Sequence, residues 1–265
     1  MRKIGYLLLF LFMAKAVGAQ SPTAFSTSKP WAYWWWPGSA VTEIGITHNL
    51  EAFSKAGFGG LHIIPIYGAK GYESKFQPYL SEGWKQKFAF VLKEAKRLHL
   101  GIDMTLGTGW PLGGPQIRKQ DAAKSYKIEE ISIAPGQIWS VPQEAIAASV
   151  YINKVFSVDL VARKKTTFQS GAEGAKVYVF LETLTNQQVK RAAPGAEGLV
   201  MDHFSKPAFE HYRESFVPLL KKSHAPLRAL YNDSYEVYGA NYTPKLFEAF
   251  EQLNHYDLRK HLDVL

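Results

Sequence analysis

Three short apolar runs, separated by helix-like stretches, constrain the fold more than any other feature of this sequence. The runs cover residues 31–36, 60–66 and 102–106. Between them lie two stretches whose apolar residues recur three and four positions apart, which is the spacing of an amphipathic helix. Because a strand, a helix and a second strand pack as a right-handed crossover, this order predicts parallel strands with helices packed on the sheet.

The ends of the second predicted helix can be read from its residues. Ser81 has a side chain that can cap the first turn, and Gly101 can terminate the last one. The apolar face between them consists of Trp84, Phe88, Val91, Leu92, Ala95 and Leu98.

The alternation of strands and helices stops between about residues 126 and 184. This stretch has β-branched runs separated by proline and glycine turns, and it contains no clear helical period. We therefore expect a small β-rich insertion. It could overhang the functional site and shape what enters, or it could be structural decoration, because long insertions in surface loops cost little stability.

The strand and helix pattern then resumes. Residues 198–202 and 227–231 are predicted strands, Ser205 and Pro207 can open a helix, and Thr243–Pro244 can open another. This gives five βα units, whereas a closed barrel of eight parallel strands typically takes about 250 residues before any insertion. The fold class predicted is α/β, an incomplete (β/α)8 TIM-type barrel, with an open doubly wound sheet as the alternative.

The N-terminal segment has the features of a secretory signal peptide. Arg2 and Lys3 precede an apolar run over residues 4–13, and small residues stand at Val17 and Ala19. We predict cleavage after Ala19 and export to the periplasm or the extracellular space, with an uncleaved anchor as the alternative. The predicted domains are the signal peptide (1–19), barrel units 1–3 (20–125), the β-rich insertion (126–190) and barrel units 4–5 (191–265).

Composition excludes several classes of function. The chain contains no cysteine, which excludes disulfides, thiolate metal sites and a cysteine nucleophile. The formal net charge is +8, and the basic residues are not interleaved with aromatics in a stripe, so nucleic acid is not an expected partner. The glycine-rich stretch at 107–115 lacks the spacing of a dinucleotide or phosphate loop. We expect no stable membrane span after signal cleavage, and the oligomeric state is left open.

Aromatic and acidic residues stand where the predicted strands end. In α/β barrels, the groups that act on a substrate lie at these positions. Aromatic rings stack on the flat CH faces of a sugar, while carboxylates bind hydroxyl groups and transfer protons. The candidates for such a site are Trp35, Tyr67, Trp110, Asp202, His203, Asp233 and Glu236.

Each candidate also has a structural interpretation. The tryptophans could pack inside a barrel, and Asp202 with His203 could form a local polar cluster. The run from Asn232 to Glu236 could be an Asx turn. His62 could be a hydrogen-bonded core histidine, and Asp103 could bond a neighbouring strand.

Several longer motifs occur in one order along the chain, and together they resemble a known family. The motifs are Trp34-Trp-Trp-Pro-Gly38, Ala56-Gly-Phe-Gly-Gly60, Ile64-Pro-Ile-Tyr-Gly68, Gly107-Thr-Gly-Trp-Pro-Leu-Gly-Gly-Pro115 and Asp233-Ser-Tyr-Glu-Val-Tyr-Gly-Ala-Asn-Tyr-Thr-Pro244. They resemble the catalytic region of glycoside hydrolase family 106, the α-L-rhamnosidases. The likeness covers most of residues 30–265 apart from the insertion.

This resemblance implies a secreted, inverting exo-hydrolase with a (β/α)8 catalytic domain and an active-site calcium ion. The substrate implied is terminal α-L-rhamnose on plant-type polysaccharides or glycoconjugates. Family members are longer, so we expect weak or no turnover from this chain alone. The alternatives are a barrel glycosidase for another sugar and a non-catalytic carbohydrate-binding or degenerate barrel.

Carried over by position, the resemblance makes Asp233 and Glu236 calcium or sugar ligands and places Glu236 among the catalytic carboxylates. Calcium prefers several hard oxygen ligands, and the side-chain oxygen of Asn232 could be a further ligand beside Asp233 and Glu236. Inversion needs a second carboxyl group, which we expect from a later strand, with Asp202 as the alternative. Trp35, Tyr67, Trp110, Asp202 and His203 are expected to bind the sugar.

Overall fold

A four-stranded, wholly parallel sheet organises one end of the molecule. The computed structural model describes residues 28–222 and 227–265, so the predicted signal peptide at 1–19 lies outside the described residues. The strand order is β1-β2-β3-β10, and each neighbouring pair is parallel. The strands are β1 (Trp31–Pro37), β2 (Gly60–Ile66), β3 (Gly101–Thr105) and β10 (Leu227–Tyr231), which confirms four predicted strands.

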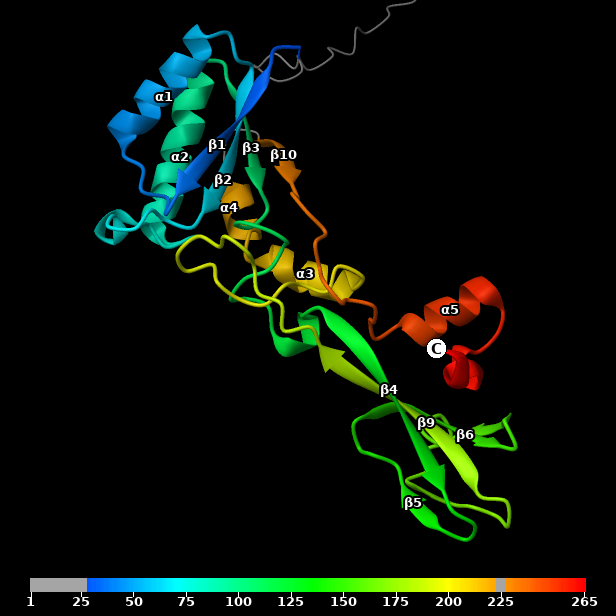
Figure 1. Cartoon of the computed structure of the whole chain (residues 1–265). Helices are drawn as coiled ribbons and strands as arrows, with labels where there is room; N and C mark the ends of the chain where they lie inside the picture. Colours follow the sequence, from blue (N-terminus) through cyan, green and yellow to red (C-terminus); the bar gives the residue numbers. More distant parts are fainter. Residues whose placement is uncertain (1–27, 223–226) are drawn as a thin grey trace, which may run out of the picture.

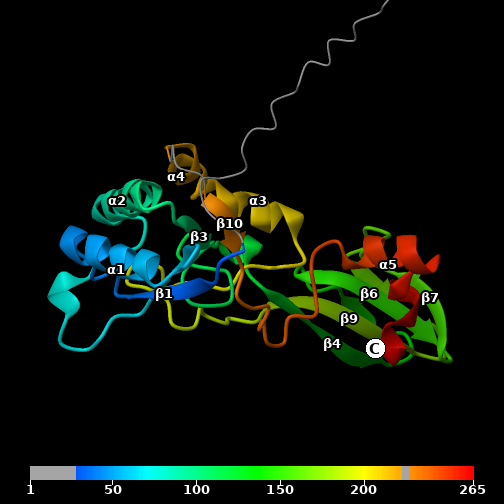
Figure 2. The same cartoon turned by 90° about the horizontal axis from the view of Figure 1, so that it is seen from above.

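Two helices, α1 (Glu43–Lys55) and α2 (Glu82–Arg97), cover one face of this sheet (Figures 1 and 2). Ser81 caps α2 as predicted, because its Oγ accepts a hydrogen bond from the Trp84 amide at 3.3 Å. Gly101 does not end the helix, since α2 stops at Arg97 and Gly101 begins β3. Strand and helix side chains share one core, which includes Leu61, Ile63, Ile102, Met104, Trp36, Ile46, Leu50, Trp84, Phe88 and Val91.

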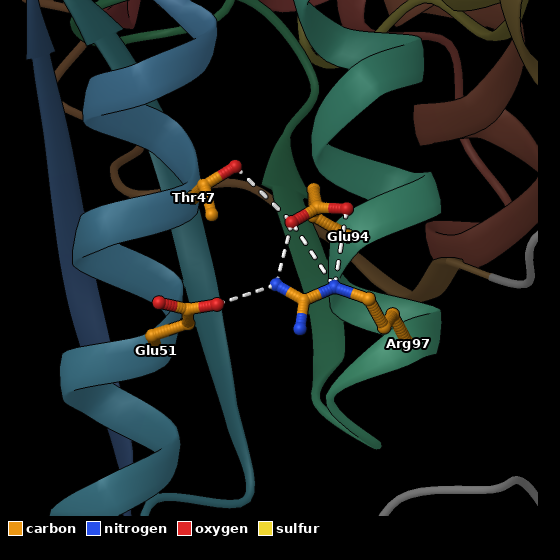
Figure 3. Close-up of polar contacts among 4 residues, drawn as sticks. All are labelled: Thr47, Glu51, Glu94 and Arg97. Atoms are coloured by element: carbon orange, nitrogen blue, oxygen red, sulfur yellow. Dashed lines mark hydrogen bonds and ion pairs between the residues drawn. The ribbon is translucent and has the colours of Figure 1, made fainter.

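A polar cluster joins the two helices beside this core (Figure 3). Glu94 on α2 is buried, and its Oε2 accepts hydrogen bonds from Thr47 Oγ1 at 3.1 Å and from Arg97 Nη2 at 2.7 Å. Arg97 also binds Glu51 on α1 at 2.8 Å. The hydrogen bonds from Arg97 are the main cause that lowers the pKa of Glu94 below its usual range. The cluster therefore links α1 to α2 through a charged carboxylate.

The prediction of a strand at residues 198–202 is wrong. Leu199, Val200 and Met201 each form only an isolated antiparallel bridge, to Gln188, Gly113 and Ala122 respectively. These loops occupy the backbone groups that a parallel neighbour would need, so β10 pairs directly with β3. The described residues form an open sheet rather than a closed barrel.

An antiparallel sheet lies at the opposite end of the molecule (Figure 1). Its strand order is β4-β9-β6-β7, and a separate two-stranded sheet pairs β5 with β8. This stretch is rich in strands and contains no helix between residues 126 and 184, as the sequence predicts. The strands are β4 (Lys124–Ile133), β5 (Ile138–Ser140), β6 (Ala145–Ile152), β7 (Val155–Asp159), β8 (Thr167–Gln169) and β9 (Ala175–Leu184).

The helix predicted after Ser205 is interrupted. Ser205 Oγ accepts from the Ala208 amide at 3.3 Å and opens α3 (Lys206–Glu214), which is followed by the separate α4 (Val217–Lys222). Tyr212 on α3 donates a hydrogen bond to the Leu106 carbonyl at 2.8 Å. Thus α3 fixes the loop that follows β3.

The last helix also differs from the prediction. Thr243 is not its cap, because α5 (Leu246–Asn254) begins three residues later and the Thr243 hydroxyl donates to Asp202 at 2.9 Å. Together with the 3-10 segment η3 (Leu258–Val264), α5 packs on the antiparallel sheet, where the buried contacts are made by Phe247, Leu258, Leu262, Phe180 and Ala147. The shorter 3-10 turns are η1 (Glu73–Lys75) and η2 (Lys119–Asp121).

None of the helices in the described ranges is long and apolar enough to cross a bilayer.

A buried lysine fixes the point where the two ends of the molecule meet. Lys124, the first residue of β4, is only 2% exposed. Its Nζ donates to the carbonyls of Gln120 at 2.6 Å and Ala122 at 3.0 Å. These bonds satisfy backbone oxygens of the η2 turn and compensate the cost of burying the ammonium group.

We expect Lys124→Met to lower the free energy of unfolding by about 1–3 kcal/mol, because the backbone carbonyls lose their donor. The measurement is urea denaturation followed by circular dichroism. Lys127→Met, which removes an exposed lysine on the same strand, is the control and should leave the midpoint unchanged. Equal midpoints for the two variants would contradict a stabilising role for Lys124.

The Glu94 cluster predicts a pH-dependent contribution to stability. Since the folded-state pKa of Glu94 is depressed, its contribution is complete above the unfolded pKa and is lost as the pH falls through the folded pKa. Glu94→Gln should lower the melting temperature by about 1–3 °C at pH 7, and the difference should close towards about pH 3. Glu248→Gln, an exposed acid on α5, is the control. A difference in melting temperature that stays constant over this pH range would contradict the explanation.

Candidate functional site

The face of the parallel sheet opposite α1 and α2 carries aromatic and polar side chains. Alternation along the strands turns one set of residues towards the helices and the other set away from them. On β1, Tyr33 is 55% exposed and Trp35 is 45% exposed, and their rings lie 6.1 Å apart. We call this set the aromatic face, and it comprises Tyr33, Trp35, His62, Thr105 and Tyr231.

His62 lies at the centre of the aromatic face. Its Nε2 is 2.9 Å from Thr105 Oγ1 on β3. The ring centroid lies 5.3 Å from that of Tyr33 and 4.7 Å from that of Tyr231. Burial lowers the pKa of His62, and the neighbouring carboxylates of Asp103 and Asp233 only partly offset this effect. The imidazole is therefore mostly neutral at pH 7. His62 is a buried, hydrogen-bonded histidine, as one interpretation of the sequence predicted, and it borders the exposed rings of Tyr33 and Tyr231.

Asp103 is held by an ion pair across two strands. Both of its carboxylate oxygens accept hydrogen bonds from Arg228 on β10, one of them at 3.1 Å from Nε. The Arg228 guanidinium also lies 3.6 Å from the ring centroid of Trp31. Asp103 thus bonds a neighbouring strand, which confirms that interpretation and leaves the carboxylate committed to structure.

Asp233 follows the carboxyl end of β10 and is exposed beside the aromatic face. Its charge acts on both His62 and Tyr231. The pKa of Tyr231 is raised, chiefly by a hydrogen bond with Tyr33 and to a smaller extent by Asp233. Next to Asp233, the Oδ1 atom of Asn232 is buried and has no hydrogen-bond partner among the described residues.

Glu236 lies on the same loop but contacts different groups. Its Oε2 is 3.4 Å from Lys190 Nζ and accepts a hydrogen bond from the Tyr238 hydroxyl at 3.2 Å. Hydrogen bonding to Tyr238, together with Glu236, raises the pKa of Lys190. Lys190 is therefore a permanent cation beside the Glu236 carboxylate.

The loop around residues 187–191, which the sequence did not single out, connects three of the predicted site residues. The backbone of Trp110 pairs with that of Lys190 through hydrogen bonds of 3.0 and 2.8 Å. The Tyr67 amide donates to the Arg191 carbonyl at 3.0 Å, and the Arg191 guanidinium covers the Tyr67 ring at 4.9 Å. Lys190 binds Glu236. The adjacent Lys190 and Arg191 are a weak signal, because two basic residues in a polar loop usually face solvent.

Asp202 is 1% exposed and holds two segments together. Its Oδ2 accepts from Thr243 and its Oδ1 from the Phe204 amide at 3.0 Å. This arrangement supports the local polar cluster considered from the sequence. His203 lies against Phe204 and Tyr235, and burial lowers its pKa. Its Nδ1 is buried without a hydrogen-bond partner in the part of the chain that the structure describes.

The residues present do not fit the calcium site expected from Asp233 and Glu236. The Glu236 carboxylate is paired with an ammonium group, which would repel a bound cation. Within residues 28–222 and 227–265, no three His, Cys, Asp or Glu side chains gather as a metal site. Asn232 and Asp233 alone supply fewer oxygens than the six to eight that calcium takes.

Comparisons with known proteins agree with the resemblance drawn from the motifs. A relative from Formosa agariphila, described as "Putative beta-glucuronidase", is 25% identical over 305 aligned positions, which cover 94% of this chain and 26% of the relative. The chain thus spans about a quarter of that curated relative.

A solved structure, the rhamnosidase from Novosphingobium sp. PP1Y, has the same fold over most of the chain. The TM-score is 0.69 at 17% identity, and the match covers 92% of this chain and 42% of that structure. The family model of glycoside hydrolase family 106, described as alpha-L-rhamnosidase, matches residues 22–156 and 143–265. Since these ranges include all of the described residues, the chain belongs to the α-L-rhamnosidase family of glycoside hydrolases.

Proposed function

We propose that this chain forms part of an exo-acting glycoside hydrolase that releases terminal α-L-rhamnose with inversion of configuration. The observation that carries the proposal is the aromatic face, which borders Asp233 where parallel strands end. A pyranose can stack its CH face on Trp35 or Tyr33, while Asp233 accepts hydrogen bonds from its hydroxyl groups. Family membership supports the reaction class.

The parallel sheet is proposed to be one side of a (β/α)8 barrel. In such a barrel the helices surround the strands, and the strand faces away from the helices line the interior. Tyr33, His62 and Thr105 have that placement, because α1 and α2 cover the other face. The likeness to a rhamnosidase structure that is more than twice as long supports this interpretation.

Glu236 is proposed as the general base. Inversion requires one protonated carboxyl group to assist the leaving oxygen and one ionised carboxylate to activate water. The Glu236 carboxylate lies beside the Lys190 ammonium and accepts a hydrogen bond from the Tyr238 hydroxyl. Because the contacts of its Oε2 are both to donor groups, Glu236 is assigned the part of the proton acceptor. Asp202, fully buried and hydrogen-bonded, does not suit the second carboxyl role.

A second candidate exists for the sugar that the enzyme releases. The Formosa agariphila relative carries a glucuronidase description, and it covers 94% of the chain. A barrel glycosidase acting on another sugar is therefore the second candidate. No catalytic step is assigned to the calcium ion that the resemblance implies, because the residues at Asp233 and Glu236 do not fit it.

Glu236→Gln in the natural protein should reduce kcat/KM on an aryl α-L-rhamnoside by about 10²-fold or more, because the amide cannot accept the proton from water. Glu129→Gln, which changes a partly exposed acid on the antiparallel sheet, is the matched control and should keep the wild-type rate. Release of the aryl group and of free sugar from a panel that includes an aryl glucuronide measures both rate and sugar preference.

Other outcomes of this assay are decisive. Full activity in Glu236→Gln would remove Glu236 from the mechanism. Preference for the glucuronide would favour the second candidate. Saturable binding of rhamnosides with no hydrolysis by the natural protein would favour a non-catalytic carbohydrate-binding barrel.

We propose that the protein is exported, with a rhamnose-containing polysaccharide or glycoconjugate as its partner. The charged start, the apolar run and the small residues before position 20 support export. N-terminal sequencing of the product secreted by its host should begin at Gln20. A product that begins at Met1 would contradict cleavage.

A further inference from the structure

A cavity of about 400 Å³ opens on the antiparallel sheet, away from the aromatic face. It lies between the β6–β7 turn, the start of β9 and the end of η3. Its volume falls within the range of about 300–1,000 Å³ that is usual for small-molecule sites. The residues that matter for its chemistry are Tyr151, Lys154, Glu173, Lys176, Tyr178 and Asp263.

Two tyrosines give this cavity a rigid aromatic wall. Tyr151 on β6 is 4% exposed, and its ring meets that of Tyr178 on β9 edge to face at 5.2 Å. Tyr178 is half-buried, so part of its surface faces the cavity. Burial raises the pKa of both phenols, which keeps them neutral hydrogen-bonding groups. A neutral, partly exposed ring suits contact with the CH face of a sugar.

The β6–β7 turn holds a cation at the cavity. Asn153 and Lys154 form a two-residue hairpin turn, and both have positive φ angles (50° and 65°), as a type I′ turn requires. The Asn153 side chain donates to Glu173 and ties the turn to the residues before β9. Lys154 itself makes no ion pair or side-chain hydrogen bond within the described ranges. Its ammonium group is therefore available as a donor.

An acceptor stands on the other side. Asp263 near the end of η3 lines the cavity beside the Tyr151 hydroxyl, and it forms no ion pair with any described side chain. The charge of the second lysine, Lys176, is balanced by an ion pair with Glu130. The groups without an ion pair are thus one cation, Lys154, and two carboxylates, Asp263 and Glu173, beside an aromatic wall. The hydroxyl groups of a neutral sugar can hydrogen-bond to both kinds of group.

We propose that this cavity binds one unit of a neutral pyranose, such as rhamnose, as a second carbohydrate site on the chain. The choice of ligand class rests on the proposed function, because a glycan-degrading enzyme meets polymers that carry many sugar units. The second site would hold one unit while the aromatic face holds another. Two linked sites increase the residence of a polymeric substrate without a new contact at either site.

The test is a titration of the ¹⁵N-labelled full chain with methyl α-L-rhamnopyranoside, followed by nuclear magnetic resonance. The backbone amides of Asn153, Lys154 and Gly174 should shift in a saturable manner. Lys154→Met and Asp263→Ala should each weaken this binding about threefold to tenfold, the usual effect of losing one hydrogen bond. Lys165→Met, which changes a lysine in the loop before β8 and outside the cavity lining, should bind like wild type.

Asp233→Asn separates this inference from the proposed function, because it alters the aromatic face and leaves the cavity intact. Cavity shifts should therefore persist in this variant. Absence of shifts at the cavity, or cavity binding unchanged by both Lys154→Met and Asp263→Ala, would overturn the inference. Tighter binding of methyl β-D-glucuronide would overturn the neutral class. Intact cavity binding in a protein that hydrolyses no rhamnoside would instead count against the proposed function alone.

Discussion

The candidate site depends on the docking of β10 beside β3. The two strands are separated by 121 residues of sequence between Thr105 and Leu227. They pair at three positions, which are Leu227 with Ile102, Leu230 with Met104 and Tyr231 with Thr105. The ion pair between Arg228 and Asp103, with the guanidinium stacked on Trp31, fixes the strand laterally. This docking brings Tyr231 against His62 and directs Asp233 to the rim of the aromatic face. Partly buried charges that are paired in this way favour one register over its alternatives.

Local patterns predicted the parallel strands well, because each was an apolar run next to an amphipathic helix. The strand at 198–202 failed for a non-local reason. Its residues are as apolar as those of a strand, but its backbone forms isolated antiparallel bridges with loop residues at 113, 122 and 188. The interruption between α3 and α4 and the start of α5 at Leu246 are likewise decided by tertiary contacts, such as the bond from Thr243 to Asp202.

The candidate site was predicted only in part. Strand ends pointed to Trp35, Tyr67, Trp110 and Asp233, since the carboxyl ends of parallel strands share one edge. The partners of Glu236 could not be predicted, because Lys190 is 46 residues away and lies in a loop without a periodic signal. His62 and Asp103 were considered as structural residues, and their bonds to Thr105 and Arg228 agree with that reasoning.

The pairing of Lys124 with Leu184 means that the chain enters and leaves the antiparallel sheet at adjacent positions. A module with neighbouring entry and exit points can be acquired or exchanged during evolution without moving the strands that flank it. Here α5 and η3 lie over the module and bury Phe247, Leu258 and Leu262 against it. Removing the module would therefore expose this apolar surface on α5 and η3, so the neighbouring entry and exit points alone do not make the module dispensable.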